Sequence, residues 1–475
     1  MWSSPITGSL RKADAAAATR FFVSFPRARL RRLRDSYVTF PPFPLSVRGM
    51  KWCVTLMAAL PLWSRAAELP PPVVPAGVGV NIHFVTGNEP DLDMIKAAGF
   101  KFIRMDFAWT SIETGKGHYD WSGYEQLLAN LERRGLRALF ILDYSHHLYE
   151  ETVTSPNPLT NVPQRSTASP QHPESIAAFA RWAAAAADHF RGRHILWEIW
   201  NEPNGSFWAP KPDAAQYAAL ALATAKAVRE ADPHATIIGP ASSGFPWEFL
   251  ETFLRSGVLE YLDAVSVHPY RDSHRPPETA AADYEKLRQL IDRFAPAGKR
   301  LPILSGEWGY SSHTHGVSLE TQAAFAARQQ LSNLLNGVPL SIWYDWKNDG
   351  PDPAENEHNF GTVLPDLQPK PAYKALQTLT RELSGCQFTR RLNLDHTPDY
   401  LLVFTDPAGK EKLAAWTAGE PHEVSVQLGG PGGGELPAVR SNGDRFTLKV
   451  GAGQVTLSLG PAPQYVSLGE RSPRF

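Results

Sequence analysis

The sequence predicts a (β/α)8 barrel followed by a smaller antiparallel β domain. Three observations support this fold class. Strand-like and helix-like segments alternate eight times between residues 77 and 383, the strand-like segments are almost continuously apolar, and the connections are short. Strands covered by helices have such unbroken apolar runs, and eight units can close into a barrel. An open, doubly wound sheet is the alternative, but no glycine-rich phosphate loop follows the first strand.

The eight units follow one another in a regular order. Each expected strand is a short run rich in β-branched and aromatic residues, and each expected helix is longer, such as the alanine-rich segment 173–190. The expected strands cover residues 77–84, 102–107, 137–143, 195–200, 236–239, 264–267, 301–306 and 339–343. The expected helices cover residues 92–98, 124–134, 173–190, 214–230, 247–255, 281–294, 319–335 and 373–383.

From about Cys386 the pattern changes to short alternating runs separated by turn residues. Hairpin turns are expected at residues 406–409 and 441–444, and the glycine-rich segment 429–434 is interpreted as a loop because no helix follows it. The chain is therefore divided into a barrel at 76–384 and a C-terminal β-sandwich at 385–475. The expected strands of the sandwich include 401–405, 412–416, 423–428, 446–450 and 455–459.

The first 75 residues are interpreted as an extension, an export signal and a linker. Residues 1–49 are basic and resemble a disordered tail or a start assigned too early, whereas residues 50–66 have the charged, apolar and small-residue parts of a signal peptide. Its apolar run of about a dozen residues is too short to span a bilayer of roughly 30 Å. We therefore expect a secreted or periplasmic protein, with a proline-rich linker at 67–75 and no stable membrane insertion.

Composition restricts the class of partner. A formal net charge of -1 gives no long-range attraction for nucleic acid or an anionic membrane. The 14 tryptophans favour a ligand with flat apolar faces and hydroxyl edges, such as a sugar, although most will lie in the core. Cys53 would leave with the signal, so Cys386 alone supports neither a disulfide nor a cysteine metal site in the mature chain.

Two glutamates end two of the expected strands. Residues 197–204 read Trp-Glu-Ile-Trp-Asn-Glu-Pro-Asn and place Glu202 where the fourth strand stops, and Glu307 follows the seventh strand in the same way. The separation of 105 residues equals 35 per unit over three units, close to the ~31 expected of a ~250-residue barrel. Because all strands of a parallel barrel point their carboxyl ends to one face, both carboxylates should face one pocket.

Paired carboxylates in a pocket suit the cleavage of a glycosidic bond. One carboxyl must be protonated to donate to the leaving oxygen, while the other must be ionised to attack or stabilise the anomeric carbon. The alternative is a chance pair of solvated glutamates at two strand ends. The aromatic neighbours of both residues argue against it, because aromatic side chains are typical of sugar sites.

The two motifs, 197–204 and 305–310, resemble those of clan A of the glycoside hydrolases, especially its cellulase-like and β-xylosidase-like families. The resemblance covers roughly residues 76–384. It implies a retaining hydrolase of β-linked or otherwise 1,2-trans glycosides without cofactor or metal, with Glu202 as acid/base and Glu307 as nucleophile. The carboxyl groups should then lie about 5–5.5 Å apart.

Further site residues are expected from the same resemblance. Asn201 would hydrogen-bond the sugar 2-hydroxyl, and Arg104 would keep the nucleophile ionised, with neutralisation of Glu198 inside the barrel as its rival role. His268 and Tyr270 would orient the nucleophile, although His268 has a core alternative. An aromatic floor is expected at Trp343 rather than Trp346.

Other aromatic and histidine residues are weaker candidates. The expected sugar contacts, each with a core alternative, are His83, Trp109, Phe207, Trp208 and Trp308. The pairs His146–His147 and His313–His315 are interpreted as surface residues, because no carboxylate stands at metal-ligand spacing. The rival function is a catalytically silent carbohydrate-binding or scaffold protein, which would be expected to lose one of the two glutamates. The loops at 145–173 and 204–213 leave endo and exo action open, and the oligomeric state is not predicted.

Overall fold

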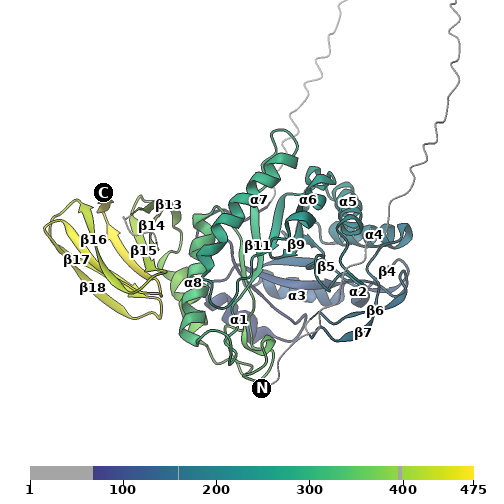
Figure 1. Cartoon of the computed structure of the whole chain (residues 1–475), viewed down its shortest axis with the longest axis horizontal. Helices are drawn as coiled ribbons and strands as arrows, with labels where there is room; N and C mark the ends of the chain where they lie inside the picture. The colour runs from purple at the N-terminus through teal and green to yellow at the C-terminus, as the bar shows by residue number, and fades with distance from the viewer. Residues whose placement is uncertain (1–67, 159, 394–397, 475) are drawn as a thin grey trace, which may run out of the picture. The chain divides into compact units, whose positions relative to one another are not determined.

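Eight parallel strands close into a barrel, as the sequence predicted (Figure 1). The computed structural model describes residues 68–158, 160–393 and 398–474. The hydrogen-bonded order β1-β12-β11-β10-β9-β8-β5-β2 returns to its start, so the carboxyl ends of all eight strands meet at one rim. The strands are β1 (Val78–Asn81), β2 (Phe102–Ala108), β5 (Arg137–Asp143), β8 (Leu196–Ile199), β9 (Thr236–Ser243), β10 (Ala264–His268), β11 (Ile303–Trp308) and β12 (Ser341–Trp343).

The helices that follow these strands form the outer layer of the barrel (Figure 1). Local sequence fixes their ends: Asp213 accepts hydrogen bonds from two backbone N–H groups at the start of α5, and Ser318 accepts one, from Thr321 N–H, at the start of α8. The eight helices that the sequence predicted are α1 (Glu89–Ala97), α3 (Ser122–Glu132), α4 (Pro173–His189), α5 (Ala214–Ala231), α6 (Trp247–Arg255), α7 (Ala281–Phe294), α8 (Leu319–Leu335) and α9 (Pro371–Glu382). Shorter helical turns are α2 (Trp109–Ile112), η1 (Val258–Glu260), η2 (Pro277–Ala280) and η3 (Glu357–Asn359).

Alternation along the strands separates two apolar layers. Residues such as Leu139, Ile238 and Leu304 fill the interior of the barrel, whereas Phe140 and Ile237 pack in the layer formed with the helices. Because successive side chains of a strand point to opposite faces, one apolar strand serves both layers. The rim at which the carboxyl ends of the strands meet is thus supported by a filled apolar core.

Two hairpins are inserted at the rim. One consists of β3 (Glu113–Gly115) and β4 (His118–Tyr119), and the other of β6 (Thr152–Pro156) and β7 (Pro163–Thr167). The sequence had predicted only a long loop at 145–173, because proline and polar residues in these short strands weaken the strand pattern.

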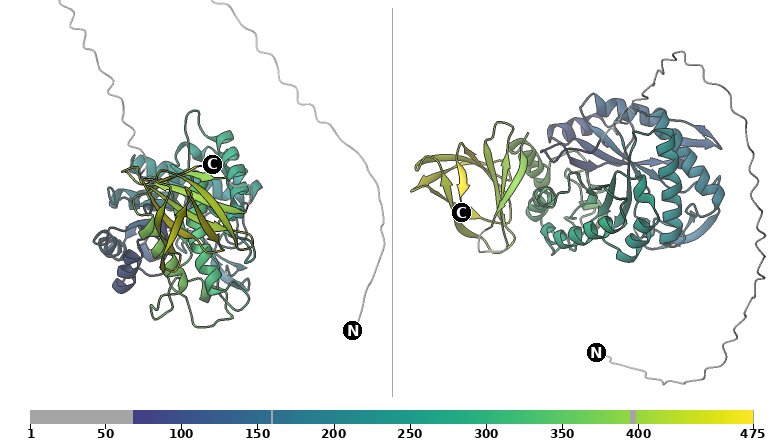
Figure 2. Two further views of the ribbon diagram at one scale, coloured as in Figure 1. Left: turned by 90° about the vertical axis from the view of Figure 1, so that its left-hand side faces the viewer. Right: turned by 90° about the horizontal axis from the view of Figure 1, so that it is seen from above.

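The C-terminal domain is one antiparallel sheet of nine strands that curls over an apolar core, as Figure 2 shows, and agrees with the predicted β-sandwich. Both predicted turns connect neighbouring strands. Four strands, β13, β17, β20 and β21, were not anticipated, since β13 is charged and β17 contains Pro437. The strands are β13 (Gln387–Leu392), β14 (Asp399–Thr405), β15 (Glu411–Thr417), β16 (His422–Gly429), β17 (Gly434–Arg440), β18 (Arg445–Gly451), β19 (Gln454–Leu459), β20 (Gln464–Gly469) and β21 (Ser472–Arg474).

A buried ion pair joins the barrel to the β domain. Arg328 on α8 donates through Nε and Nη2 to the two carboxylate oxygens of Glu278, each at 2.7 Å, and the indole N–H of Trp416 on β15 donates to Glu278 Oε1 at 2.8 Å. All three side chains are buried. The pair is bidentate and lies within the barrel, and the β domain contacts it through Trp416 and through Pro461 O, which accepts from Arg328 Nη1 at 3.3 Å.

We expect Arg328→Met to lower the free energy of unfolding by about 3–5 kcal/mol, because it leaves Glu278 as a buried, uncompensated charge. Denaturant unfolding of wild type and variant measures the difference. The double variant Arg328→Met/Glu278→Met should recover most of the loss. Equal stability of wild type and single variant would contradict a structural role of the pair.

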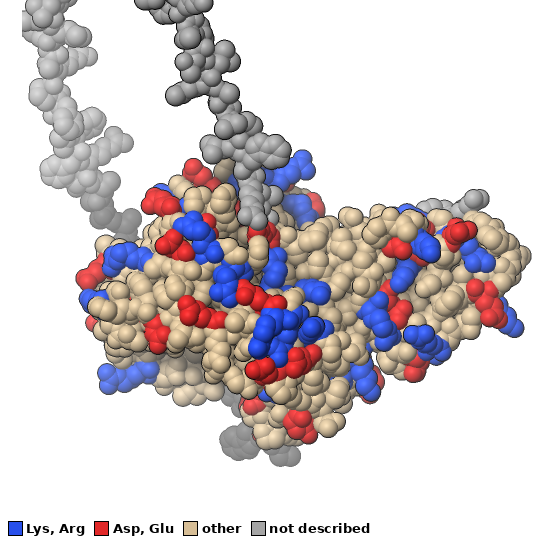
Figure 3. Space-filling view, turned by 180° about the vertical axis from the view of Figure 1, so that it is seen from behind, with Lys and Arg blue, Asp and Glu red and all other residues tan. Residues whose placement is uncertain are grey.

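The predicted extension (1–49) and export signal (50–66) lie outside the described residues. Among residues 68–474 as described, no helix combines the length and the apolar character needed to cross a membrane. Basic and acidic side chains are intermixed on the face shown in Figure 3. The linker is held by backbone hydrogen bonds between Val74 and residues 385–386.

Candidate active site

A cavity of about 620 Å³ opens at the carboxyl ends of the barrel strands. Glu202, after β8, and Glu307, near the carboxyl end of β11, both line it, which is the convergence that their positions at the ends of two expected strands predicted. Of the other expected residues, Asn201, Arg104, His83, Tyr270 and Phe207 also line the cavity. Its further lining residues are Asn81, Asp106, Tyr144, Asn157, Pro158, Ser243, Tyr344, Asn356, Glu357 and Phe360.

The backbone turns sharply where β8 ends, and this turn directs Glu202 into the cavity. Trp200 and Glu202 have φ angles of 70° and 44°, in the left-handed region that residues other than glycine rarely adopt. Backbone hydrogen bonds from Trp200 N to Leu142 O and from Glu202 N to Ala241 O hold the turn against the neighbouring strands. Such strained residues cost of order 1–3 kcal/mol each and are common at functional sites.

Glu307 is held by two hydrogen-bond donors. Arg104 Nη1 donates to Glu307 Oε2 at 2.6 Å, and the Tyr270 hydroxyl donates to Glu307 Oε1 at 2.8 Å. Burial and the Glu307 charge raise the pKa of Tyr270 well above its usual value, so the phenol stays protonated and donates. Donors on both oxygens fix the orientation of the Glu307 carboxyl.

Glu202 has a different partner, His268. The Nδ1 atom of His268 lies 2.9 Å from Glu202 Oε1, and its Nε2 atom lies 3.2 Å from Arg104 Nη2. Because a guanidinium can only donate, Nε2 accepts a hydrogen bond from Arg104. Nδ1 therefore carries the ring proton and donates a hydrogen bond to Glu202 Oε1. The expectation that His268 orients the nucleophile is therefore corrected: its Nδ1 atom lies 4.0 Å from Glu307 Oε2, beyond hydrogen-bond distance, because Glu202 Oε1 is the nearer acceptor.

The two carboxylates lie close together. One carboxylate oxygen of Glu202, one of Glu307 and one ring nitrogen of His268 all lie within 4.8 Å of one another. Retaining glycosidases have carboxyl groups about 5–5.5 Å apart, whereas inverting enzymes leave roughly 6.5–9.5 Å for a water molecule. The spacing is that of a direct attack on the sugar.

Arg104 lies at the centre of this network and has both of the roles considered from the sequence. Besides Glu307, it donates through Nε to Glu198 Oε2 at 2.7 Å and through Nη2 to Asn201 Oδ1 at 2.7 Å. Arg104 is 1% exposed and Glu198 is fully buried inside the barrel, as strand alternation predicted. Burial lowers the pKa of Arg104, but Glu198 and Glu307 outweigh it and raise the pKa.

Several expected aromatic contacts are corrected by the structure. Trp343 packs between barrel and helices and donates to Phe360 O at 3.3 Å, because Ile342 takes the interior position and alternation turns Trp343 outwards. Tyr344 lines the cavity instead, and Trp346 is also buried. A register shift between Ser305 and Trp308 likewise directs Trp308 outwards. The other expected contacts that are fully buried away from the cavity are Trp109 and Trp208.

Sequence reasoning missed an acidic group on β2. Asp106 lines the cavity two residues after Arg104, so alternation along the strand could have found it. Asp143 is fully buried, and burial together with the Asp106 charge raises its pKa well above the usual value. Two carboxyls from neighbouring strands, β2 and β5, therefore interact on this side of the barrel, and only Asp106 reaches the cavity.

His83 follows β1, the strand next to β2, and is in contact with Asp345. His83 Nε2 is 3.5 Å from Asp345 Oδ2, and the ring packs edge-on against Tyr344 with centroids 5.6 Å apart. Burial lowers the pKa of His83, but Asp345 outweighs this and raises it to about 9. His83, Asp345 and Asp349 are also arranged so that they could hold a metal ion, with ligand atoms within 4.8 Å of one another.

The histidine pairs differ from the expectation in one residue. His147 and His315 are exposed and His313 is partly exposed, whereas His146 is 1% exposed and its Nε2 lies 2.9 Å from Glu113 O. The hairpin formed by β3 and β4, which the sequence did not reveal, covers His146 and supplies this partner.

The raised pKa of His83 predicts a pH dependence of stability. The folded-state pKa of about 9 exceeds the ordinary 6.5, so the contribution is fully present below pH 6.5 and is lost as pH rises through 9. We expect the unfolding free energy to fall across this window in wild type, and to fall less steeply in His83→Gln. Denaturant titrations at pH 6, 8 and 10 measure both slopes, and identical slopes would contradict the ion pair.

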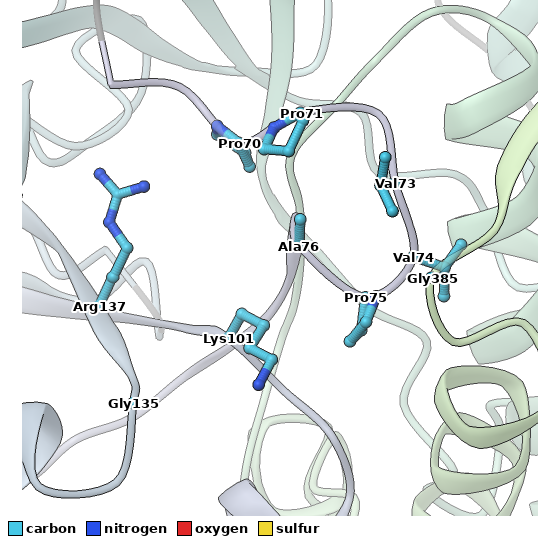
Figure 4. Close-up of a pocket in the computed structure, with 10 residues that line it drawn as sticks. All are labelled: Pro70, Pro71, Val73, Val74, Pro75, Ala76, Lys101, Gly135, Arg137 and Gly385. Atoms are coloured by element: carbon cyan, nitrogen blue, oxygen red, sulfur yellow. The ribbon is translucent and has the colours of Figure 1, made fainter. Parts of the chain in front are cut away.

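A second large cavity, of about 470 Å³, is formed by residues of the linker and by loops that precede β2 and β5 (Figure 4). Apolar linker residues and two basic side chains, Lys101 and Arg137, line it, and no carboxylate does. It therefore holds no pair of carboxylates, whereas the cavity at the rim holds Glu202 and Glu307.

The chain resembles known glycoside hydrolases. The family model described as cellulase (glycosyl hydrolase family 5) matches residues 75–350. A β-xylosidase of Geobacillus stearothermophilus is 35% identical over 206 residues, which are 38% of this chain and 40% of that protein. A β-xylosidase of Caldicellulosiruptor saccharolyticus is 24% identical over 208 residues, 40% of this chain and 41% of that protein. The matched part thus spans about two fifths of these curated relatives.

Similarity extends further among solved structures. A family 39 glycoside hydrolase from the gut symbiont Bacteroides cellulosilyticus WH2 is 27% identical, with a TM-score of 0.70. The match covers 84% of this chain and 81% of that protein, and therefore includes more than the barrel.

Proposed function

We propose that this chain, which belongs to the cellulase family (glycosyl hydrolase family 5), is a retaining glycoside hydrolase that cleaves β-glycosidic bonds by double displacement. The observation that supports this most strongly is the pair Glu202 and Glu307, whose nearest oxygens lie within 4.8 Å at the rim of the barrel. The different partners of the two carboxyls support their different roles.

In the first step Glu307 attacks the anomeric carbon while Glu202 donates its proton to the leaving oxygen. The bond between that carbon and the leaving oxygen breaks, its electron pair stays with the oxygen, and a covalent glycosyl-enzyme forms. Arg104 and Tyr270 hold the Glu307 carboxyl in position for the attack through one hydrogen bond to each of its oxygens. His268 fixes the orientation of Glu202 through Oε1.

In the second step a water molecule replaces the leaving group. Glu202, now ionised, takes a proton from this water, the resulting hydroxide attacks the anomeric carbon, and Glu307 leaves as a carboxylate. Two inversions at the anomeric carbon give net retention of its configuration.

Asn201 accepts a hydrogen bond from Arg104 through Oδ1, which leaves its amide N–H groups to donate to a sugar hydroxyl.

The substrate class is a neutral β-linked glycan, with β-xylosides as first choice. The matched relatives named β-xylosidases favour xylose, and the stacked rings of Tyr144 and Phe207, 5.7 Å apart, provide an apolar surface in a cavity that also offers polar groups. Sugars present both C–H faces and hydroxyl edges, so such a surface suits them.

The test is turnover of aryl β-glycosides with detection of the first-formed anomer. The purified wild type is incubated with aryl β-xyloside, β-glucoside and β-galactoside, and proton NMR follows the anomeric signal of the released sugar. We expect release of the β-anomer from at least one substrate. Release of the α-anomer would refute double displacement, and binding without turnover on these substrates and on polysaccharides would refute the hydrolase proposal.

We also propose that the protein is exported through the signal-like segment at residues 50–66. The segment supports this by its lysine, its apolar run and its small residues. A fusion of residues 50–75 to a reporter enzyme should appear outside the cytoplasm, and Leu56→Arg in the apolar run should retain it inside. Equal retention of both fusions would contradict the proposal.

A further inference from the structure

A smaller cavity lies next to the one that holds the two glutamates. This side cavity has a volume of about 300 Å³, and three of its lining residues, His83, Asp345 and Asp349, carry side chains of the kinds that bind metal ions. One ligand atom from each of the three lies within 4.8 Å of those of the other two. His83 also lines the cavity of Glu202 and Glu307, so its imidazole belongs to the walls of both cavities.

The ends of two paired strands bring these three side chains together. His83 follows β1, and Asp345 and Asp349 follow β12, which pairs with β1 in parallel. A backbone hydrogen bond from Trp346 N to Asn81 O, at 3.0 Å, joins the two segments just beyond the strands. The backbone therefore fixes the positions from which His83 and Asp345 approach each other.

Asp345 presents a buried carboxylate without hydrogen-bond donors. Its side chain is 1% exposed, and neither oxygen accepts a hydrogen bond from the part of the chain that the structure describes. A buried acceptor without a partner destabilises the fold. His83 Nε2 lies 3.5 Å from Asp345 Oδ2, farther than the about 2.7–2.9 Å of a charge-assisted hydrogen bond. A cation bound between the two side chains would give the carboxylate the partner that it lacks.

The 3.5 Å between these two atoms is the spacing of neighbouring ligands around a small metal ion. Zn²⁺ binds imidazole nitrogen and carboxylate oxygen at about 2.0–2.2 Å in a tetrahedron, which sets neighbouring ligand atoms roughly 3.3–3.6 Å apart. Asp349 is exposed, so its side chain is free to adjust as the third ligand. Water would take the fourth position, as it does in zinc sites with three protein ligands.

The lysines near the side cavity are directed to other partners. Lys347 donates to Asp91 Oδ1 at 2.8 Å, and Lys370 donates to Asn348 Oδ1 at 3.1 Å. Neither lysine donates a hydrogen bond to Asp345, so neither takes the place of the cation. One imidazole and two carboxylates suit a transition-metal ion such as Zn²⁺ better than Ca²⁺ or Mg²⁺, which prefer oxygen ligands alone.

We propose that His83, Asp345 and Asp349 form a binding site for a divalent transition-metal ion of the Zn²⁺ type in the side cavity. The ion replaces the imidazole proton, so the ion pair of His83 with Asp345 and the fall in stability up to pH 9 are properties of the protein without metal. Because His83 lines both cavities, the bound ion holds one wall of the cavity of the two glutamates. The proposal does not depend on the hydrolase function, since the ion binds without turnover.

The experiment titrates ZnCl₂ into the purified, chelator-treated protein at pH 8 and measures binding by calorimetry. For wild type we expect one Zn²⁺ bound per chain and a melting temperature that rises with free Zn²⁺, because the ion binds the folded protein. Asp349→Ala and His83→Phe should each weaken binding about tenfold or more, since each removes a ligand. The matched control is Asp292→Ala, at an exposed aspartate of α7, which should bind Zn²⁺ as wild type does.

Three results would overturn the proposal: no binding of Zn²⁺ to wild type, the same affinity in Asp349→Ala as in the control, or loss of binding in Glu307→Gln. The last result would place the ion at Glu202, His268 and Glu307, whose ligand atoms also lie within 4.8 Å of one another. We expect Glu307→Gln to bind Zn²⁺ as wild type does. Asp349→Ala decides the test even if His83→Phe fails to fold, because Asp349 is exposed.

Discussion

Glu307→Ala is expected to lower kcat for an aryl β-glycoside by about 10⁵-fold, because it removes the group that forms the covalent intermediate. Sodium azide should restore part of the rate, since a small anion fits the space left by the carboxylate and attacks the anomeric carbon. That product is a glycosyl azide of inverted configuration. Steady-state rates and NMR of the azide adduct measure both effects.

Glu202→Ala is the matched comparison and should behave differently. Loss of the general acid costs about 10²–10⁴-fold for a substrate with a poor leaving group. Formation of the glycosyl-enzyme from a dinitrophenyl glycoside should be affected far less, because that leaving group needs no proton. Azide should then give an adduct of retained configuration. If both variants gave the same azide product, the assignment of acid/base and nucleophile would be wrong.

Arg104→Leu is expected to lower the free energy of unfolding by about 3–5 kcal/mol as well as activity. The variant leaves Glu198, which is fully buried, without its cation, and it removes the donor 2.6 Å from Glu307 Oε2. Denaturant unfolding measures the stability loss, and kcat/KM with aryl β-glycosides measures the second effect.

The double variant Arg104→Leu/Glu198→Leu separates the two roles of Arg104. Because it removes the uncompensated charge, it should recover most of the stability. Its activity should stay as low as that of the single variant, since Glu307 still lacks its donor. Recovery of activity together with stability would show that Arg104 acts on catalysis only through folding.

Sequence reasoning succeeded where a pattern repeats or where chain order fixes position. Eight apolar runs alternating with helical segments defined the barrel, and parallel strands brought Glu202 and Glu307 to one rim although 105 residues separate them. Alternation from Glu202 also placed Glu198 inside the barrel. These inferences depend only on the two-residue alternation of side chains along a strand and on the common direction of parallel strands.

It failed where a strand ends or where distant loops meet. Trp308 turns outwards at a register shift, and Tyr344, not Trp343, lines the cavity, because alternation cannot be continued through an irregular strand end. Whether His268 hydrogen-bonds Glu202, after β8, or Glu307, on β11, depends on the orientation of its ring. No pattern in the local sequence encodes that orientation.

The sequence by itself therefore determined the barrel, the β-sandwich and the two glutamates at the end of β8 and β11. Only the tertiary structure decided which donors each glutamate receives, that Arg104 serves Glu198 and Glu307 together, and that a side cavity lies behind His83. The physical reason is that periodicity fixes the direction of a side chain within one strand, whereas hydrogen-bond partners and cavities depend on side chains from several strands and loops meeting in space.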